Sequence, residues 1–307
     1  MDRVRTAGHQ PGNRTAQAKK EAAGLGVLLA LVATVVWSGS FVATRGMADS
    51  IPPVQAVFWR WIIAIAAVAP LAAREAWRQR HLIRRHLGFV TLASFFGIAL
   101  YNTLVHQAGL TTSASNMGMI MAASPVIMAV FARLGGQQLG AVRSFGLLLA
   151  ASGVLLLVGK GSLTVDFAAG DLWMFGAALS FASYSALLRR KPAEISGLTF
   201  LLTTFVFGAL MLAPAYAVSV AVQGGFEVSA GTVGPLLYVG VFSSAVAFFA
   251  WNKAISLIGA ARAGVVYYLQ PVCVAVLGFL LLGEQTGPVQ LLCMGLILGG
   301  VALGARR

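Results

Sequence analysis

Long apolar stretches of the sequence carry neutral polar and aromatic residues near their middles, and these residues are the best candidates for chemistry. A buried hydroxyl or amide needs a hydrogen-bonding partner, which a neighbouring helix or a ligand can supply. For each residue alone, a bond between helices is the simpler explanation. As a set, aromatic walls with a few neutral polar groups predict a cavity for a small zwitterion with an apolar side chain. The candidate substrate-binding residues are Trp37, Ser40, Tyr101, Asn102, Asn116, Met119, Ile120, Ser180, Tyr184, Phe248, Trp251, Asn252, Tyr267, Tyr268 and Gln270.

Acidic residues are missing from the middles of these stretches. An ionised side chain at the bilayer centre costs roughly 2.5–3.5 kcal/mol on insertion scales, so those found there usually have a function. The sequence therefore disfavours a carboxylate proton relay and a charge-paired site for cations. His106 is the only histidine within an apolar stretch. We interpret it as a polar packing residue, with coupling to a proton as the alternative.

Two arginines depart from the general charge pattern. Arg60 stands between Trp59 and Trp61, and the favoured interpretation is an arginine that reaches the lipid headgroups from an interfacial aromatic belt. The alternative is an external gate or an attraction point for a carboxylate. For Arg45 the two interpretations stay equally open.

Sequence signatures of enzymes and metal sites are absent. There is no HExxH, no paired buried carboxylate, no Gly-rich phosphate loop and no G-x-S-x-G. The two cysteines, Cys273 and Cys293, lie inside apolar stretches and are interpreted as small hydrophobic residues. We expect no catalytic residue, metal or cofactor, and a membrane-embedded enzyme is disfavoured.

The elements that position the candidate residues are transmembrane helices. The 307 residues are 58% hydrophobic and 10% charged, whereas soluble domains carry about 25% charged residues. Apolar stretches of about 18–25 residues match the length of a helix that crosses the hydrocarbon core. The sequence predicts an all-α integral membrane protein with ten spans near 24–45, 54–73, 87–108, 113–133, 143–160, 170–189, 197–221, 232–252, 261–282 and 287–305.

Basic residues predict the orientation of these spans. Most of the 22 Lys and Arg fall in alternate loops and in a tail over residues 1–22, which we expect to be disordered. The positive-inside rule then places both termini in the cytoplasm of a bacterial inner membrane and requires an even number of spans. The net charge of +13 is explained by topology, so nucleic acid is not an expected partner. The first span lacks a convincing cleavage site and is expected to be retained.

An internal repeat divides the chain into two halves, 23–160 and 168–305. The stretch from Thr112 to Pro125 is echoed by Gly259 to Pro271, close to half the chain length away. Five spans per half would insert the halves in opposite directions, an inverted repeat typical of carriers. Both prolines fall within expected spans, where each removes a backbone hydrogen bond. We interpret Pro125 and Pro271 as hinges, with a packing kink as the alternative.

These motifs resemble those of the drug/metabolite transporter superfamily with EamA-type repeats. The resemblance rests on Trp37-Ser38-Gly39-Ser40-Phe41, on Thr111 to Pro125, on Ser243 to Ala254, on Gly259 to Pro271, and on Leu281-Leu282-Gly283-Glu284. It implies a ten-helix transporter, closest in look to exporters of amino acids, aromatic ones especially. The first half departs from the pattern at Gly136-Gln137-Gln138, where the second half has Gly283-Glu284.

The expected function is export of amino acids or related small metabolites from the cytoplasm by alternating access. Alternatives are a multidrug or nucleoside/sugar carrier of the same fold and, disfavoured, a channel. Facilitated diffusion and proton coupling stay open. Small residues in spans five and ten, among them Gly146, Ala150 and Gly300, predict close packing of these helices within one chain, with a dimer surface as the alternative. The protein is expected to be a monomer or homodimer.

Overall fold

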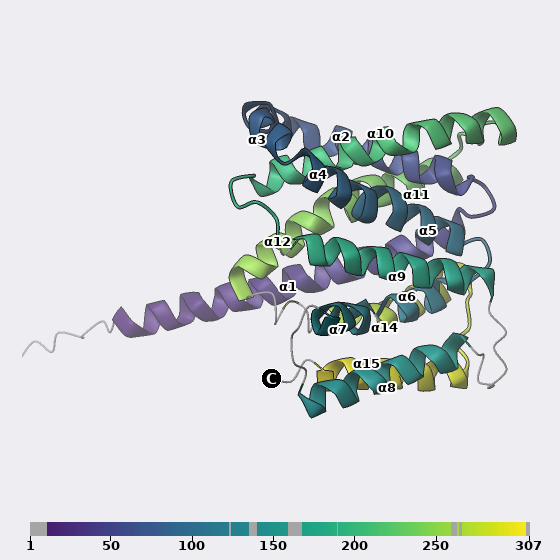
Figure 1. The fold of residues 1–307 in the computed structure, drawn as a ribbon. Coiled ribbons are helices and arrows are strands. Elements are labelled where there is room, and N and C mark those ends of the chain that lie inside the picture. Colours follow the sequence, from purple (N-terminus) through teal and green to yellow (C-terminus); the bar gives the residue numbers. More distant parts are fainter. Residues whose placement is uncertain are drawn as a thin grey trace, which may run out of the picture.

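The computed structural model describes residues 11–122, 124–134, 140–158, 168–188, 190–258, 263 and 266–304. The described residues form helices and connecting turns, without strands, and the helices pack side by side as a bundle (Figure 1). The elements are α1 (Pro11–Gly46), α2 (Pro53–Arg78), α3 (Arg80–Arg85), α4 (Leu87–Ser94), the π-helix η1 (Phe95–Leu100), α5 (Tyr101–Ala108), α6 (Ala114–Ala122), α7 (Ser124–Leu134), α8 (Ala141–Val158), α9 (Ala169–Leu188), α10 (Gly197–Gln223), α11 (Ala230–Leu237), the π-helix η2 (Tyr238–Val246), α12 (Ala247–Ile258), α14 (Gln270–Leu282) and α15 (Pro288–Gly304).

The outside of the bundle is apolar. Five helical stretches are long and apolar enough to cross a membrane, namely Glu21–Gly46, Pro53–Arg78, Leu87–Ala108, Gly197–Gln223 and Ala230–Ile258. Shorter apolar helices accompany them, and large side chains such as Leu71, Leu148 and Leu280 are exposed. A surface of this kind fits lipid as the solvent. The expected all-α membrane class is confirmed, whereas the count of ten spans stays a prediction.

The N-terminal segment differs from the expected disordered tail. Helix α1 begins at Pro11 and continues unbroken to Gly46, so the described part of the tail is helical and extends from one end of the bundle (Figure 1). Residues 1–10 lie outside the described chain. The stretch Thr15 to Ala23 is rich in Ala, Lys, Gln and Glu, which favour helix. Extending an existing helix also avoids the cost of a new nucleus.

Helices of the first half pack mainly on helices of the second half. The most extensive contacts pair α1 with α12 and α14, α2 with α10, α5 with α9, α6 with α14, and α8 with α15. Figure 1 shows α2 beside α10 and α8 beside α15. The interior is therefore shared between the halves.

Helices α8 and α15 touch through glycine. A Cβ added at Gly300 would lie 2.4 Å from the Ala150 nitrogen and 2.5 Å from the Gly146 oxygen. One added at Gly153 would lie 2.9 Å from Ile297 Cγ1. Only glycine permits such a close approach of two backbones. The expected packing of these two helices within one chain is confirmed.

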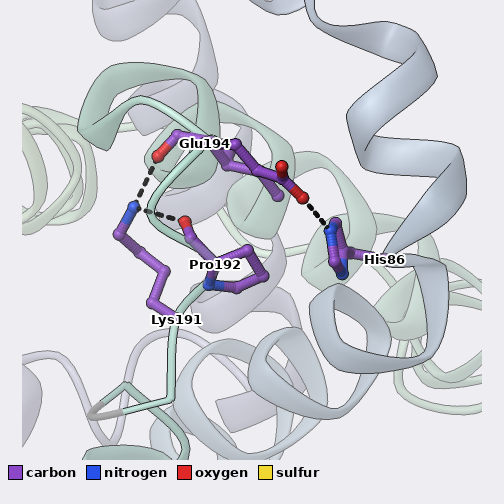
Figure 2. Close-up of polar contacts among 5 residues, drawn as sticks. His86, Lys191, Pro192 and Glu194 are labelled. Carbon is purple, nitrogen blue, oxygen red and sulfur yellow. Dashed lines mark hydrogen bonds and ion pairs between the residues drawn. The ribbon is translucent and has the colours of Figure 1, made fainter.

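Two loops at the end of the bundle from which α1 extends are tied together. The His86 imidazole, between α3 and α4, pairs with the Glu194 carboxylate in the connection from α9 to α10 (Figure 2). The backbone N–H of Ser196 donates to Gln79 Oε1 at 3.0 Å. Lys191 Nζ donates to the backbone carbonyl oxygens of Pro192 and Ile195 in the same connection. These contacts fix the short connection before α10.

The Glu194 carboxylate makes this loop contact sensitive to acid. The hydrogen bond with His86 lowers the pKa of Glu194, partial desolvation opposes the shift, and the charge of Arg85 adds to it. The pKa of Glu194 is lower in the folded than in the unfolded protein, so the ionised carboxylate stabilises the fold. This stabilisation is fully present above the ordinary pKa of about 4.3 and is lost as the pH falls through the lowered pKa of the folded state. Glu194→Gln is therefore expected to lower the melting temperature near neutral pH and to have no effect in strong acid. A scan of melting temperature against pH checks this, and an equal difference at every pH would contradict it.

Candidate substrate site

Two π-helical segments interrupt otherwise regular helices. Segment η1 lies between α4 and α5, and η2 lies between α11 and α12. In both, a polar side chain bonds a carbonyl five residues back: Asn102 Nδ2 donates to the Gly97 oxygen at 3.2 Å, and Ser244 Oγ donates to the Val239 oxygen at 2.8 Å. These two bonds stabilise the wider turns. Single π-turns are frequent at functional sites.

Side chains from neighbouring helices bond the π-segments across the two halves. Trp37 Nε1 of α1 donates to the Ser243 carbonyl in η2 at 3.0 Å. Ser180 Oγ of α9 donates to the Phe96 carbonyl in η1 at 2.7 Å. Tyr184, one turn further along α9, packs against Gly97, where an added Cβ would lie 2.5 Å from its ring. The side chains of Ser180 and Tyr184 therefore hold α9 on η1.

Four of the predicted residues form one aromatic cluster. The Trp37 ring lies 5.4 Å from the centroids of Phe248 and Trp251 and 5.9 Å from Tyr267. Trp251 and Tyr267 are 5.7 Å apart. The cluster joins α1 and α12 to Tyr267, which lies three residues before the start of α14. Edge-on and tilted rings of this kind provide an apolar but polarisable wall.

Arg60 lies in the interior, and the favoured interpretation of an arginine that reaches the headgroups is wrong. The side chain is only 6% exposed. Its Nε donates to Ser244 Oγ at 3.2 Å, its Nη1 to Ser40 Oγ at 3.4 Å, and its Nη2 to Ser243 Oγ at 3.3 Å. The guanidinium also lies 5.2 Å from the Trp61 ring centroid. We call these four residues, Arg60, Ser40, Ser243 and Ser244, the arginine cluster.

The sequence carried a signal for this burial that aromatic neighbours obscured. Ala56 and Ala64, one helical turn before and after Arg60, are fully buried, whereas Trp59 is 37% exposed. Arg60 therefore shares the inward face of α2 with small residues, which leave space for the three serines of α1 and η2. The flanking tryptophans, and not this i±4 pattern, led to the interfacial interpretation.

Tyr101, Asn102 and His106 follow η1 on the inside of α5. Tyr101 is half-buried with its ring 5.6 Å from Phe181, and both Tyr101 and His106 lie within range of the Arg60 charge. His106 is 3% exposed and Asn102 is 2% exposed. Within the described chain, His106 Nε2 and Asn102 Oδ1 have no hydrogen-bonding partner. The sequence thus identified a buried polar row, whose role in binding stays a prediction.

Another group of polar contacts lies at the opposite end of the bundle from the extended start of α1. The Glu284 carboxylate accepts hydrogen bonds from the N–H groups of Ala114 at 3.0 Å and Ser115 at 3.3 Å, and from Ser115 Oγ at 3.3 Å. It therefore caps the start of α6. Gln290 Nε2 donates to Asn116 Oδ1 at 2.8 Å. Glu284 has no counterpart in the first half of the sequence, and its capping role was not predicted from the sequence.

Arg45 contributes to the same end of the bundle. Its Nη1 donates to the Gly109 carbonyl at 3.1 Å, and Thr112 Oγ1 donates to Asp171 Oδ1 at 2.6 Å. These bonds connect α1 and α9 to the turn between α5 and α6. Arg45 thus has a structural partner, and its predicted part in a gate remains untested.

The remaining predicted residues are spread over the interior and surface. Met119 and Ile120 are buried among apolar side chains, and Tyr268 packs against the same group. Gln270 is 1% exposed, and its backbone carbonyl accepts from Ser38 Oγ at 3.3 Å. Asn252 is exposed on α12. The structure therefore brings together only part of the predicted set.

Pro271 does not interrupt a helix, in contrast to its expected place within the span 261–282. Residues Tyr268 and Leu269 form a turn, and α14 begins at Gln270 with Pro271 in its first turn. A proline costs little there because the first N–H groups of a helix have no intrahelical partner. Pro125 is the second residue of α7, but Ala123 and the Pro125 side chain lie outside the described part, so the second expected hinge stays a prediction.

The apolar exterior and the buried polar residues define a multi-pass helical membrane protein. The EamA-like transporter family matches residues 24–159 and again residues 168–305, so the chain belongs to this family. It is accordingly a membrane transporter with a small-molecule substrate, and not an enzyme.

Curated relatives agree with this assignment. The chain is 26% identical to the uncharacterized transporter YyaM of Bacillus subtilis, over 74% of this chain and 76% of the relative. It is 24% identical to an uncharacterized transporter of Archaeoglobus fulgidus, over 84% and 89%. It is 25% identical, over 91% and 93%, to a probable terminal-alkyne amino-acid exporter of Streptantibioticus cattleyicolor. A solved crystal structure that is 20% identical shares the fold, with a TM-score of 0.60 over 91% of this chain and 95% of that chain.

Proposed function

We propose that the protein exports neutral amino acids, aromatic ones included, or closely related small zwitterions from the cytoplasm. The observation that carries the proposal is the aromatic cluster of Trp37 and the three rings around it, which adjoins neutral hydrogen-bonding groups in the interior. Such a wall accepts an apolar or aromatic side chain, and the adjoining hydroxyls and amides suit the polar end of the same molecule. The similarity to a probable amino-acid exporter supports the same substrate class.

Transport is proposed to proceed by alternating access between two inverted five-helix repeats, with ten spans and both termini in the cytoplasm of a bacterial inner membrane. The two successive family matches support a repeat. The helix packing supports it as well, because the contact of α1 with α12 has its counterpart in the contact of α9 with α5. The two π-segments at corresponding places in the halves are a third support. Repeats of this kind exchange conformations to open alternately to each side.

Efflux from proteoliposomes tests the proposal directly. Vesicles loaded with radiolabelled phenylalanine, leucine or alanine are expected to lose label only when the protein is present. Imposing a pH gradient then separates facilitated diffusion from proton coupling. Folded protein that releases no amino acid would overturn the proposal, and release of nucleosides or dyes instead would favour the multidrug or nucleoside/sugar alternative.

Trp37→Ala gives a sharper form of this test. The substitution removes three ring contacts and the hydrogen bond to η2, so we expect efflux of phenylalanine to fall by about tenfold or more. Trp77→Phe is the matched control, because Trp77 is 71% exposed near the end of α2. Equal efflux rates in the two variants would contradict a role for the aromatic cluster in transport.

A further inference from the structure

The arginine cluster holds a buried positive charge that no acidic side chain of the described chain neutralises. The ion pair between His86 and Glu194 lies in the loops, between α3 and α4 and between α9 and α10. Two carboxylates at one end of the bundle already accept hydrogen bonds from other groups: Asp171 from Thr112, and Glu284 from the backbone at the start of α6. A guanidinium stays charged in proteins, and burying such a charge without an opposite charge is costly. A buried and conformationally fixed arginine without a counter-ion is suited to receive a negative charge from outside the chain.

We infer that the arginine cluster binds the carboxylate of the transported molecule, so that a free carboxylate is the feature which substrates share. The inference rests on the proposed function, and it assigns the recognition of one chemical group to named residues. The residues that bind the carboxylate are Arg60, through its guanidinium, and Ser40 and Ser243, through their hydroxyls.

The hydrogen bonds within the cluster leave donor capacity on the guanidinium for an incoming carboxylate. The guanidinium has five N–H groups, of which three reach serine hydroxyls at 3.2–3.4 Å. Charge-assisted bonds to carboxylate are shorter, about 2.7–2.9 Å, and roughly twice as strong as neutral ones. A carboxylate can therefore take the place of weakly held hydroxyls along the edge of the guanidinium fork, while the Trp61 ring 5.2 Å away packs near it.

The serines differ in what they can offer the ligand. Ser244 Oγ already donates its proton to the Val239 carbonyl at 2.8 Å. The hydroxyls of Ser40 and Ser243 accept from Arg60 and have no acceptor of their own among the described residues. Both can rotate to donate to a carboxylate oxygen. Ser244 fixes the guanidinium, and Ser40 and Ser243 complete the binding group.

Ser243 connects the arginine cluster to the aromatic cluster around Trp37. The hydroxyl of Ser243 accepts from Arg60, and the carbonyl of Ser243 accepts from the Trp37 indole. Ser40 lies one turn after Trp37 on α1. A molecule whose carboxylate meets Arg60 can thus place an apolar side chain against the rings. The ligand class is a small carboxylate with an apolar or aromatic side chain. The amino group of an amino acid is secondary, because no acidic side chain of the described chain lies within range of the Arg60 charge.

Three ligands that differ by one group each test this assignment. Phenylalanine carries both charged groups, 3-phenylpropanoate lacks the amino group, and 2-phenylethylamine lacks the carboxylate. Calorimetric titration of the detergent-solubilised protein is expected to give binding of the first two and about 100-fold weaker binding of the amine.

Substitutions at Arg60 then separate recognition from structure. Arg60→Gln is expected to weaken binding of both carboxylates about 100-fold and to leave the amine unchanged, so the preference for carboxylate disappears. Arg60→Lys keeps a charge without the planar fork and should retain part of the preference. Arg78→Gln, an exposed arginine at the end of the same helix, is the control. If Arg60→Gln does not fold, the double variant Ser40→Ala with Ser243→Ala is measured instead and should lose the preference partly.

The outcomes distinguish this inference from the proposed function. A preference for carboxylate that persists in Arg60→Gln, or persists unchanged in the double serine variant, overturns the inference even if wild-type efflux of amino acids is found. Loss of affinity for all three ligands alike also overturns it, since that indicates a packing role. If vesicles release no amino acid but 3-phenylpropanoate binds the wild type and not Arg60→Gln, the proposed function fails and the carboxylate site stands.

Discussion

Gly300→Leu is expected to destabilise the protein by roughly 3 kcal/mol or more, the upper end of the range for overpacking a well-packed interior. A Cβ at this position would lie 2.4 Å and 2.5 Å from backbone atoms of Ala150 and Gly146. Backbone atoms cannot swing aside as a flexible side chain can, so α8 and α15 would have to separate along their contact. Thermal unfolding in detergent, followed by the loss of monodisperse protein, measures the effect.

Gly295→Leu on the same helix is the matched control. Gly295 is exposed and has open space where its Cβ would stand. The added apolar side chain should therefore leave the melting temperature nearly unchanged. If the two leucine variants melt alike, the close contact between α8 and α15 does not limit stability. Gly300→Ala is expected to fall between them, because its single methyl group meets the same backbone atoms.

Glu284→Ala is expected to loosen the end of the bundle where α6 begins. The carboxylate satisfies the N–H groups of Ala114 and Ser115, and loss of an N-cap costs about 1–2 kcal/mol, which includes the favourable charge at a helix N-terminus. A free-energy change of this size shifts the ratio of open to closed forms by about 5–30-fold. The variant should therefore spend more time with this end of the bundle open.

Thiol labelling measures that opening. Met117 lies one turn inside α6 and is fully buried, so Met117→Cys in a background without Cys273 and Cys293 should react slowly with maleimide in detergent. Adding Glu284→Ala should raise the rate about tenfold. Glu227→Ala, which removes an exposed carboxylate before α11, is the control. Unchanged labelling in the Glu284 variant would mean that the cap does not hold this end closed.

The class of the protein was predictable because it depends on local composition. An apolar stretch long enough to cross a bilayer indicates both a helical structure and a lipid environment, since backbone N–H and C=O groups in lipid must form hydrogen bonds within their own segment. The glycine contact of α8 with α15 was also predictable, because small residues that recur on one face of a transmembrane helix usually mark a close helix–helix contact. The aromatic residues Trp37, Phe248, Trp251 and Tyr267 were recognised individually, and the fold brings them together.

Two of the errors share one physical origin, which is that the partners lie half a chain away. The interior place of Arg60 depends on Ser243 and Ser244, and the role of Glu284 depends on the start of α6. No local pattern specifies such pairings. The position of Pro271 was misjudged for a different reason. The turn at Tyr268 and Leu269 lies inside an apolar stretch, so no polar residue within the turn marks it in the sequence.

The sharing of one interior between the two halves has a consequence for how the protein is made. Arg60 and Ser243 are 183 residues apart, so at about 5–20 residues per second the arginine leaves the ribosome roughly 10–40 s before its hydrogen-bonding partner. For most of that interval α1 and α2 exist without α12 and α10, the helices against which they pack. Synthesis of this chain thus passes through a half-made form that carries an unsatisfied charge and uncovered helix faces. The insertion machinery or surrounding lipid must protect that form until the second half arrives.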